Sequence, residues 1–416
     1  MPTKCIVIFK YGPSRQHGAA LLIMLVILVV GIAAVLVSSL TSSAVKTARD
    51  DNTAAVLAQA KEALIGYAVT YSDTHGGQAP GYLPCPDPNG TTGVNGEGSS
   101  ETCGSKNVSA LGRLPWKTLG LSPLRDGNGE CLWYAVAGTY KNNPMTDLMN
   151  WDTNGQFQVF SASNVMLTGQ LPDSYAVAII FSPGVSLSNQ NRSPDGTTPI
   201  CGGNYTASNY LDSDATIGAN NAAPSSIANA ISQFFAAGAT SNINDRIIFI
   251  TKNDIWNAIK KRNDFQPASP NNPLNNMTLA AATCLASAGS PKQFNPSYVS
   301  NINGWIPSAT TLKNYNSTCA NLYNTWNNWW SNWADHLFYA ANSPIVNVSS
   351  YDSAVIFANQ KLSGQNRRTT TPDDYLEASN LTSFKNGGTV YQTSPLSSTF
   401  NDVLFCVSSS TAISCP

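Results

Sequence analysis

Apolar positions follow two different patterns along the first part of this 416-residue chain. The segment from Ala19 to Val37 is an unbroken apolar run, about 28 Å long as a helix and close to the hydrocarbon thickness of a bilayer. From Ala44 to Tyr71, apolar residues recur at the spacing of an amphipathic helix without an intervening proline. We therefore predict one spine helix over residues 19–75, whose first part, residues 19–40, is transmembrane.

Later segments have the aromatic and β-branched density of short strands between turn signals. Strands are predicted at Leu132–Ala137, Phe157–Phe160, Ala176–Phe181 and Arg246–Thr251. Helices are predicted at Ser225–Ala236, Asp254–Arg262 and Leu279–Ala288.

The second half of the chain repeats the first in the same order. The matches are Ala178–Phe181 with Ala354–Phe357, Leu187–Arg192 with Leu362–Arg367, Asn209–Asp212 with Asp374–Glu377, and Asn244–Phe249 with Asn401–Cys406. Convergent spacing is the alternative explanation. We predict an α+β fold, in which the hydrophobic spine helix precedes a duplicated head of two related units, residues 80–262 and 275–416, each with a helix on a mostly antiparallel sheet.

Composition narrows the classes of function. Only 11% of the residues are charged and the formal net charge is −1, so the basic footprint of a nucleic-acid-binding protein is missing. The chain has only three histidines, and its sequence contains no recognisable nucleophile, metalloprotease, phosphate-binding or dinucleotide-binding motif. We expect no enzyme activity and no cofactor.

Eight of the nine cysteines follow the apolar run, and Cys5 alone precedes it. An even number in loop-like sequence indicates disulfides in an oxidising compartment. Eight cysteines allow 105 connectivities. Pairing of nearest neighbours would join Cys85 to Cys103, Cys131 to Cys201, Cys284 to Cys319 and Cys406 to Cys415.

Three groups of residues suggest binding chemistry, and each has a simpler explanation. Asp87 with Asn89, and Asp126 with Asn128, are weak calcium candidates in glycine-rich loops, where the same residues also form ordinary turns. A recurring arginine and carboxylate could line a binding site in each unit, but we favour structural ion pairs, Arg192 with Asp212 and Arg367 with Glu377. The tryptophans at 326, 329, 330 and 333 share one helical face, which favours core packing over an exposed platform.

Three basic residues, Lys4, Lys10 and Arg15, precede the apolar run. By the positive-inside rule, the N-terminus stays in the cytoplasm and the rest of the chain lies outside. A cleaved signal peptide, a signal anchor and a prepilin leader over residues 1–18 all agree with this orientation.

The boundary sequence Arg15-Gln-His-Gly-Ala-Ala-Leu-Leu22 resembles the leader of type IV prepilins and type II secretion pseudopilins. The resemblance implies cleavage after Gly18 by a prepilin peptidase, N-methylation of Ala19 and assembly with other pilin or pseudopilin subunits. Family members usually carry glutamate at the fifth mature position, which is Ile23 here. In lacking this glutamate the chain resembles the K-type minor pseudopilin and the X-type minor pilin, which are both associated with filament tips.

The predicted function is therefore that of a minor pilin-like or pseudopilin-like structural subunit in filament assembly, tip display or adhesion. Its head would be periplasmic while the subunit lies in the inner membrane, and would reach the cell surface if the subunit is assembled. The alternative is a single-pass envelope protein with a disulfide-stabilised head that binds a ligand.

Overall fold

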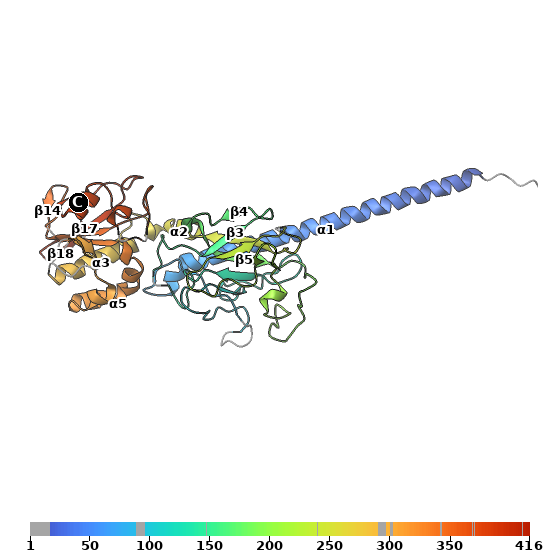
Figure 1. Cartoon of the computed structure of the whole chain (residues 1–416), viewed down its shortest axis with the longest axis horizontal. Coiled ribbons are helices and arrows are strands. Elements are labelled where there is room, and N and C mark those ends of the chain that lie inside the picture. Colours follow the sequence, from blue (N-terminus) through green and yellow to red (C-terminus); the bar gives the residue numbers. More distant parts are fainter. Residues whose placement is uncertain are drawn as a thin grey trace, which may run out of the picture.

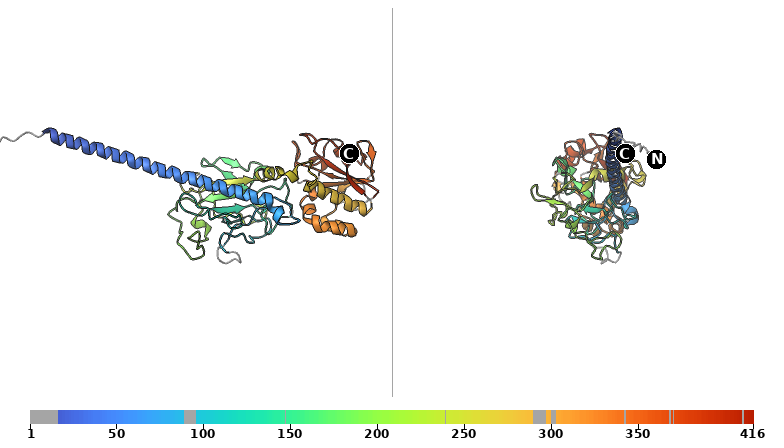
Figure 2. Two further views of the ribbon diagram at one scale, coloured as in Figure 1. Left: turned by 180° about the vertical axis from the view of Figure 1, so that it is seen from behind. Right: turned by 90° about the vertical axis from the view of Figure 1, so that its right-hand side faces the viewer.

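The computed structural model describes residues 17–88, 96–146, 148–238, 240–289, 297–299, 303–341, 343–367, 369, 371–409 and 411–416. The long helix α1, His17–Thr74, projects from one end of a head that contains two sheets (Figures 1 and 2). The second sheet lies at the far end of the head from the projecting part of α1 (Figure 1). The predicted leader residues 1–16, including Cys5, lie outside the described residues.

The predicted fold class needs a correction at its N-terminus. We expected a hydrophobic spine that crosses a membrane over residues 19–40, but among the residues that the structure describes no helix is both long enough and apolar enough to do so. The side chains described in α1 include the apolar stretch Met24–Val30. Charged residues follow from Lys46 onward.

The first sheet contains strands β1 to β5, β8 and β9. Their bounds are β1 Ala110–Arg113, β2 Trp133–Val136, β3 Phe157–Phe160, β4 Met166–Thr168, β5 Ala176–Ser182, β8 Ser232–Phe235 and β9 Arg246–Thr251. Strands β1, β2, β5 and β9 follow one another across the sheet, and each neighbouring pair is antiparallel. Strand β8 pairs in parallel with β3, and the small ribbon of β6 (Ser213–Asp214) and β7 (Ala219–Asn220) stands apart.

The second sheet repeats this central order. Its strands, in order across the sheet, are β10 Ser297–Val299, β11 Asn303–Trp305, β12 Leu337–Ala340, β15 Ser353–Phe357, β17 Val403–Ser408 and β18 Thr411–Ser414. All neighbouring pairs are antiparallel, so β11, β12, β15 and β17 correspond to β1, β2, β5 and β9. A separate small sheet joins β13 (Ile345–Val346), β14 (Ser349–Ser350) and β16 (Val390–Tyr391).

One helix covers the equivalent face of each sheet. Helix α1 contacts β5 and β9 through a row of residues spaced by three or four positions, Thr53, Leu57, Ala60, Leu64, Ala68 and Tyr71. Helix α3, Pro273–Ser287, contacts β15, β17 and β18 in the second unit. Both helices present small and aliphatic side chains to the sheets, which allows close approach.

Shorter helices complete the head. They are α2 Lys252–Lys260, α4 Ala309–Lys313, α5 Ser317–Asn332 and α6 Ala378–Asn386. Helix α2 begins at a capping box, in which the Thr251 hydroxyl accepts from Asp254 N and the Asp254 carboxylate accepts from Thr251 N. This cap places the start of α2 two residues before the predicted start.

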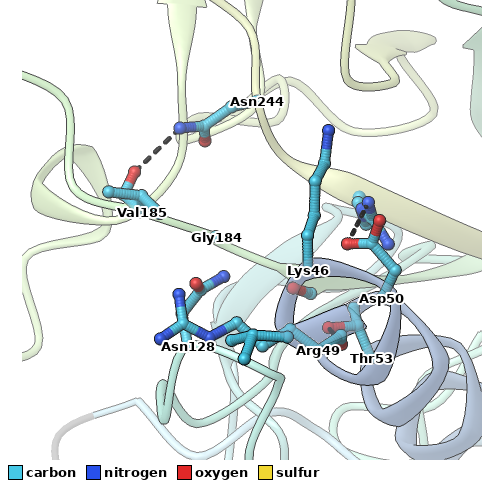
Figure 3. A pocket seen from close by; sticks show the side chains of 11 residues that line it. Lys46, Arg49, Asp50, Thr53, Asn128, Gly184, Val185 and Asn244 are labelled. Atoms are coloured by element: carbon cyan, nitrogen blue, oxygen red, sulfur yellow. Dashed lines mark hydrogen bonds and ion pairs between the residues drawn. The ribbon is translucent and has the colours of Figure 1, made fainter. Parts of the chain in front are cut away.

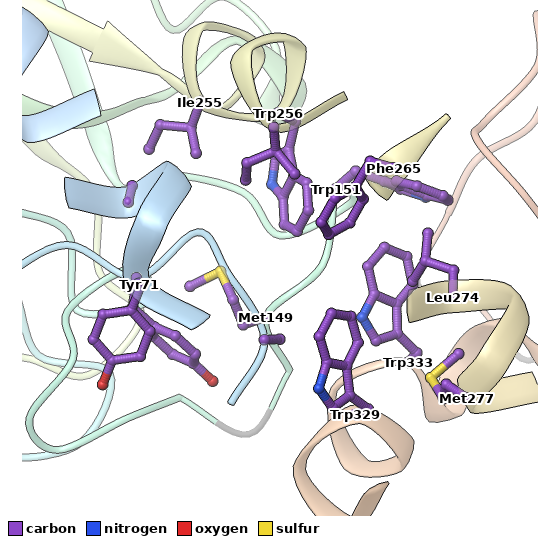
Figure 4. Packing of buried hydrophobic residues seen from close by; sticks show 14 of the residues in the cluster. Tyr71, Met149, Trp151, Ile255, Trp256, Phe265, Leu274, Met277, Trp329 and Trp333 are labelled. Atoms are coloured by element: carbon purple, nitrogen blue, oxygen red, sulfur yellow. The ribbon is translucent and has the colours of Figure 1, made fainter. Parts of the chain in front are cut away.

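The two units share one hydrophobic core. Side chains from α1, α2, α3 and α5 meet between them, as Figure 4 shows for Tyr71, Trp256, Met277, Trp329 and Trp333. Trp329, Trp330 and Trp333 are buried, which confirms core packing over an exposed platform. The outer face of each sheet has its own smaller core.

One predicted helix is wrong. The segment Ser225–Ala236 contains strand β8 in place of a helix, and the φ angle of Asn229 is +61°. A left-handed residue interrupts a right-handed helix, and Asn229 N instead donates to the carbonyl oxygen of Asn107 over 2.9 Å. The paired phenylalanines that follow then lie in β8 against β3.

The prediction of disulfides is confirmed. The structure contains four, Cys85–Cys103, Cys131–Cys201, Cys284–Cys319 and Cys406–Cys415, which are the nearest-neighbour pairs. The first two lie in the first unit and the last two in the second, so each unit is crosslinked internally.

Candidate functional site

The candidate site is the part of α1 outside the head, together with the groove where α1 enters the head. The side chains of Met24–Val30 and of Ile32 are each more than half exposed, between 53% and 76%. Consecutive helical residues are about 100° apart, so seven in succession cover the whole circumference of the helix. This segment is therefore apolar on every side. The predicted processing pair, Gly18 and Ala19, lies at the start of α1.

The loop of residues 126–130 holds α1 where the helix enters the head. Gly127 lies so close to Arg49 that a Cβ atom there would be 2.2 Å from the Arg49 carbonyl oxygen. Gly127 N donates to Thr53 Oγ1 over 2.9 Å. A glycine is required here because backbone meets backbone, and the contact sets where α1 leaves the head.

A groove of about 640 Å³ opens beside this contact, between α1 and the loops after β5 and before β9 (Figure 3). Asp50 pairs with Arg246 across it, at 2.7 Å between Oδ1 and Nη2. Lys46 and Arg49 extend from α1 to line the groove (Figure 3), and within the described residues their side chains form no ion pair or hydrogen bond. The groove therefore carries two uncompensated positive charges.

The loop that holds α1 is also one of the two calcium candidates, and its carboxylate is occupied by protein donors. Asp126 Oδ1 accepts from Asn128 N over 2.8 Å and from Glu130 N over 3.0 Å. Asp126 Oδ2 accepts from Ser182 Oγ over 2.7 Å and from Gly184 N over 3.1 Å. Asp126 thus shapes the loop, as in ordinary turns.

The other calcium candidate has a similar arrangement. Asp87 Oδ2 accepts from Gly98 N and from the Tyr205 hydroxyl, both over 2.6 Å, and Asn89 lies outside the described residues. Throughout the described part of the chain, no group of three or more histidine, cysteine, aspartate or glutamate residues is arranged to hold a metal ion.

The recurring arginine and carboxylate of the first unit meet through a glutamine. Gln190 Nε2 donates to Asp212 Oδ1 over 2.8 Å, and Gln190 Oε1 accepts from Arg192 Nη2 over 2.7 Å. Arg192 forms its ion pair with Glu130, at 3.2 Å. The structure thus joins Arg192 to Asp212 through Gln190 instead of through the direct ion pair that we expected.

The second unit repeats this arrangement. Gln365 Nε2 donates to Glu377 Oε1 over 2.8 Å, and Gln365 Oε1 accepts from Arg367 Nη2 over 3.1 Å. Arg367 Nε lies 3.8 Å from Asp152 Oδ2 in the first unit. The expected Arg367–Glu377 ion pair is therefore also replaced by a contact through glutamine, because the glutamine side chain reaches both partners.

A second buried carboxyl group completes each network. Asp245 Oδ2 accepts from Asp212 N over 2.8 Å, and Asp402 Oδ2 accepts from Glu377 N over 3.1 Å. Burial raises the pKa of Asp245 well above its usual value, and the neighbouring Asp212 charge raises it further. Burial and the Glu377 charge do the same for the pKa of Asp402. Both networks are buried within the head, and Arg367 links the second network to Asp152 of the first unit, so we interpret both as structural.

A buried polar cluster between the units surrounds His336. His336 Nδ1 lies 2.9 Å from Asp335 Oδ1, and His336 Nε2 lies 2.9 Å from Asp152 Oδ2 of the first unit. Burial alone would lower the pKa of His336, but the two aspartates outweigh it and raise the pKa above 6.5. The protonated ring then donates to both aspartates, and the 3.0 Å contact of Nε2 with Trp151 Nε1 is not a hydrogen bond in that form.

Sequence reasoning missed the residues that define the groove. Gly127 and Asp126 were assigned to a calcium candidate or a turn, although their role is to hold α1. The only local signal was an Asp-Gly-Asn-Gly-Glu loop, which many turns share. The Asp50–Arg246 pair joins residues 196 positions apart and left no local signal.

Comparison with models of protein families, with curated proteins and with solved structures finds no match. The candidate site is therefore argued from its own geometry.

Replacing Gly127 by valine should lower the free energy of unfolding by about 1–3 kcal/mol, because its Cβ would overlap the backbone of Arg49 and the helix must shift. Thermal or urea unfolding of the full chain measures this effect. Gly76 is exposed and, like Gly127, has no positive φ angle, and a Cβ there meets no atom within 4 Å. Gly76→Val is the matched control, and equal losses in both variants would contradict a close contact specific to Gly127.

Proposed function

We propose that this protein is a structural subunit of a type IV pilus-like or type II secretion filament, with a role in assembly and display. One observation carries the proposal: the exposed segment of α1 is apolar around its whole circumference. Such a helix needs apolar surroundings on every side. A bundle of equivalent helices from neighbouring subunits provides them, while the head remains on the outside of the bundle.

The rest of the structure supports this role. Each unit of the head has two disulfides, which fits an oxidising compartment such as the periplasm or the cell surface. Each unit has a buried polar network of its own, and Arg367 of the second unit contacts Asp152 of the first, which suits a head that is displayed as one body. Assembly, and not chemistry, is the proposed function.

The proposal predicts a defined mature N-terminus. A prepilin peptidase of the inner membrane would cleave after Gly18, as the resemblance of residues 15–22 implies, so that the mature chain begins with N-methylated Ala19. Intact-mass and N-terminal peptide mass spectrometry of chain isolated from bacterial envelopes tests this. Gly18→Leu should abolish the cleavage, whereas Gly31→Leu in the same helix should leave it unchanged.

Two other results would contradict this prediction. An intact Met1 or a cleavage near Ala44 would show that the N-terminal segment is not a prepilin leader. With no contact between copies, such a result would favour an envelope protein with a disulfide-stabilised binding head.

Packing between subunits is tested by a photo-crosslinking amino acid in the full chain. At Leu28, which is 61% exposed on α1, we expect crosslinks to another subunit. At Val348, which is 93% exposed on the head, we expect far fewer, because the head lies outside the bundle. Equal yields at the two positions, or none at Leu28, would rule out the proposed packing.

A further inference from the structure

Two basic residues and one acidic residue that lack ion-pair partners lie on opposite faces of α1. The row that packs on the head includes Thr53. At about 100° per residue, Lys46 and Arg49 lie within about 40° of Thr53, over the groove, whereas Glu62 lies about 180° away on the outer face. Glu62 is exposed, and its side chain has no ion pair or hydrogen bond with the described residues.

We infer that the groove beside α1 binds the outer face of α1 of a second copy of this chain, with Glu62 of that copy between Lys46 and Arg49. This inference rests on the proposed function and adds a defined contact to it. The occupant follows from charge complementarity. The groove has two positive side chains without partners (Figure 3), and the outer face of α1 has an unpaired carboxylate.

The positions along the helix define the arrangement of the two copies. Arg49 and Glu62 are 13 residues apart, which is about 20 Å along α1. Two parallel copies displaced by about 20 Å therefore bring Glu62 of one copy to Arg49 of the other. Lys46 lies one turn from Arg49 on the same face and is within reach of the same carboxylate.

The contact joins two different surfaces, the groove of one copy and the outer face of α1 of the next. Such a heterologous contact does not close on itself, so each bound copy offers a free groove or a free outer face to another. Repetition with a constant displacement along the helix produces an open filament. The charged contact would set the register of the copies, and the apolar segment of α1 would supply most of the buried area.

Charge reversal tests the inference in the full chain. Two differently tagged copies are co-expressed, each with the photo-crosslinker at Leu28, and the yield of mixed crosslinked dimer is measured. Arg49→Glu or Glu62→Arg should each lower the yield about fivefold, because attraction becomes repulsion. With both substitutions in one chain, positions 49 and 62 again carry opposite charges, and the yield should recover in part, because Lys46 remains positive.

Asp51→Arg is the matched control. Asp51 lies on the same outer face about 16 Å from Glu62 along the helix, so the substitution changes the net charge equally without touching the inferred contact. Circular dichroism of each variant should be unchanged, because these exposed side chains form no ion pair or hydrogen bond with the described residues. The yield for Asp51→Arg should remain close to that of the wild type.

Each remaining outcome has a defined meaning. If every variant crosslinks as the wild type does, the contact is wrong while the proposed packing of α1 stands. If the double variant fails to recover, or if Asp51→Arg lowers the yield equally, the pairing is also wrong. If the wild type forms no mixed dimer, the inferred second copy is excluded and the proposed function loses its main support.

Discussion

Replacing Trp333 by alanine is expected to lower the free energy of unfolding by about 3–5 kcal/mol. Trp333 is fully buried between the two units. Its ring lies edge-on to that of Trp151, with centroids 4.4 Å apart, and it also contacts Trp256 at 5.8 Å (Figure 4). The large loss follows because the rings of Trp151, Trp256 and Phe357, from distant parts of the chain, would face one cavity. Urea unfolding followed by tryptophan fluorescence and circular dichroism measures it.

Two control variants distinguish the loss of packing between the units from the effect of removing any tryptophan. Trp333 Nε1 has no hydrogen-bond partner among the described residues, so Trp333→Phe loses packing area but no hydrogen bond and should cost much less. Trp326 lies in α5, which ends just before Trp333, and is only partly buried, so Trp326→Ala should also cost less. Equal losses for Trp333→Ala and Trp326→Ala would contradict a central role of Trp333 between the units.

Replacing His336 by glutamine is expected to lower the free energy of unfolding by about 3 kcal/mol near pH 6 and to reduce its dependence on pH. The variant leaves Asp335 and Asp152 buried without a positive partner between them. The wild type carries this charge because the folded-state pKa of His336 is raised above 6.5. Its contribution to stability is therefore complete below pH 6.5 and is lost as the pH rises through the folded-state pKa.

Other titratable and charged groups near His336 also affect how stability depends on pH. They are Asp335, Asp152, Arg367 beyond Asp152, and Tyr375, whose ring centroid is 5.8 Å away. The raised pKa values of the buried carboxyl groups in the two networks also reduce stability as the pH rises. Those groups remain in the variant, so the difference between wild type and His336→Gln from pH 5 to 9 isolates the histidine. A constant difference across that range would contradict a charged His336.

Much of the sheet structure could be predicted from local pattern. The strands Phe157–Phe160 and Arg246–Thr251 are confirmed at both ends. Alternating apolar and aromatic residues between turn signals determine such strands locally. The helix predicted for Ser225–Ala236 was wrong, although the spacing of its residues suits a helix. Contacts with distant residues, of Asn229 with Asn107 and of β8 with β3, give this segment its extended structure.

Interactions of buried polar groups could be predicted only in part. The repeated sequences identified the residues of the two networks, but the arginine and carboxylate of each network are joined through Gln190 or Gln365. Which side chain bridges two others depends on distances of a few tenths of an ångström, and sequence order does not contain them. The same holds for His336, whose partner Asp152 lies 184 positions away.

The sequence by itself determined the local elements of this protein: an amphipathic row along residues 44–71, short apolar strands, an even set of cysteines and a repeated order of motifs. These features depend on residues close together in the chain, so their periodicity reveals them. Only the tertiary structure decided that the loop of residues 126–130 holds α1 and that Lys46 and Arg49 line an open groove, because these features require backbone and side chains from distant parts of the chain to meet.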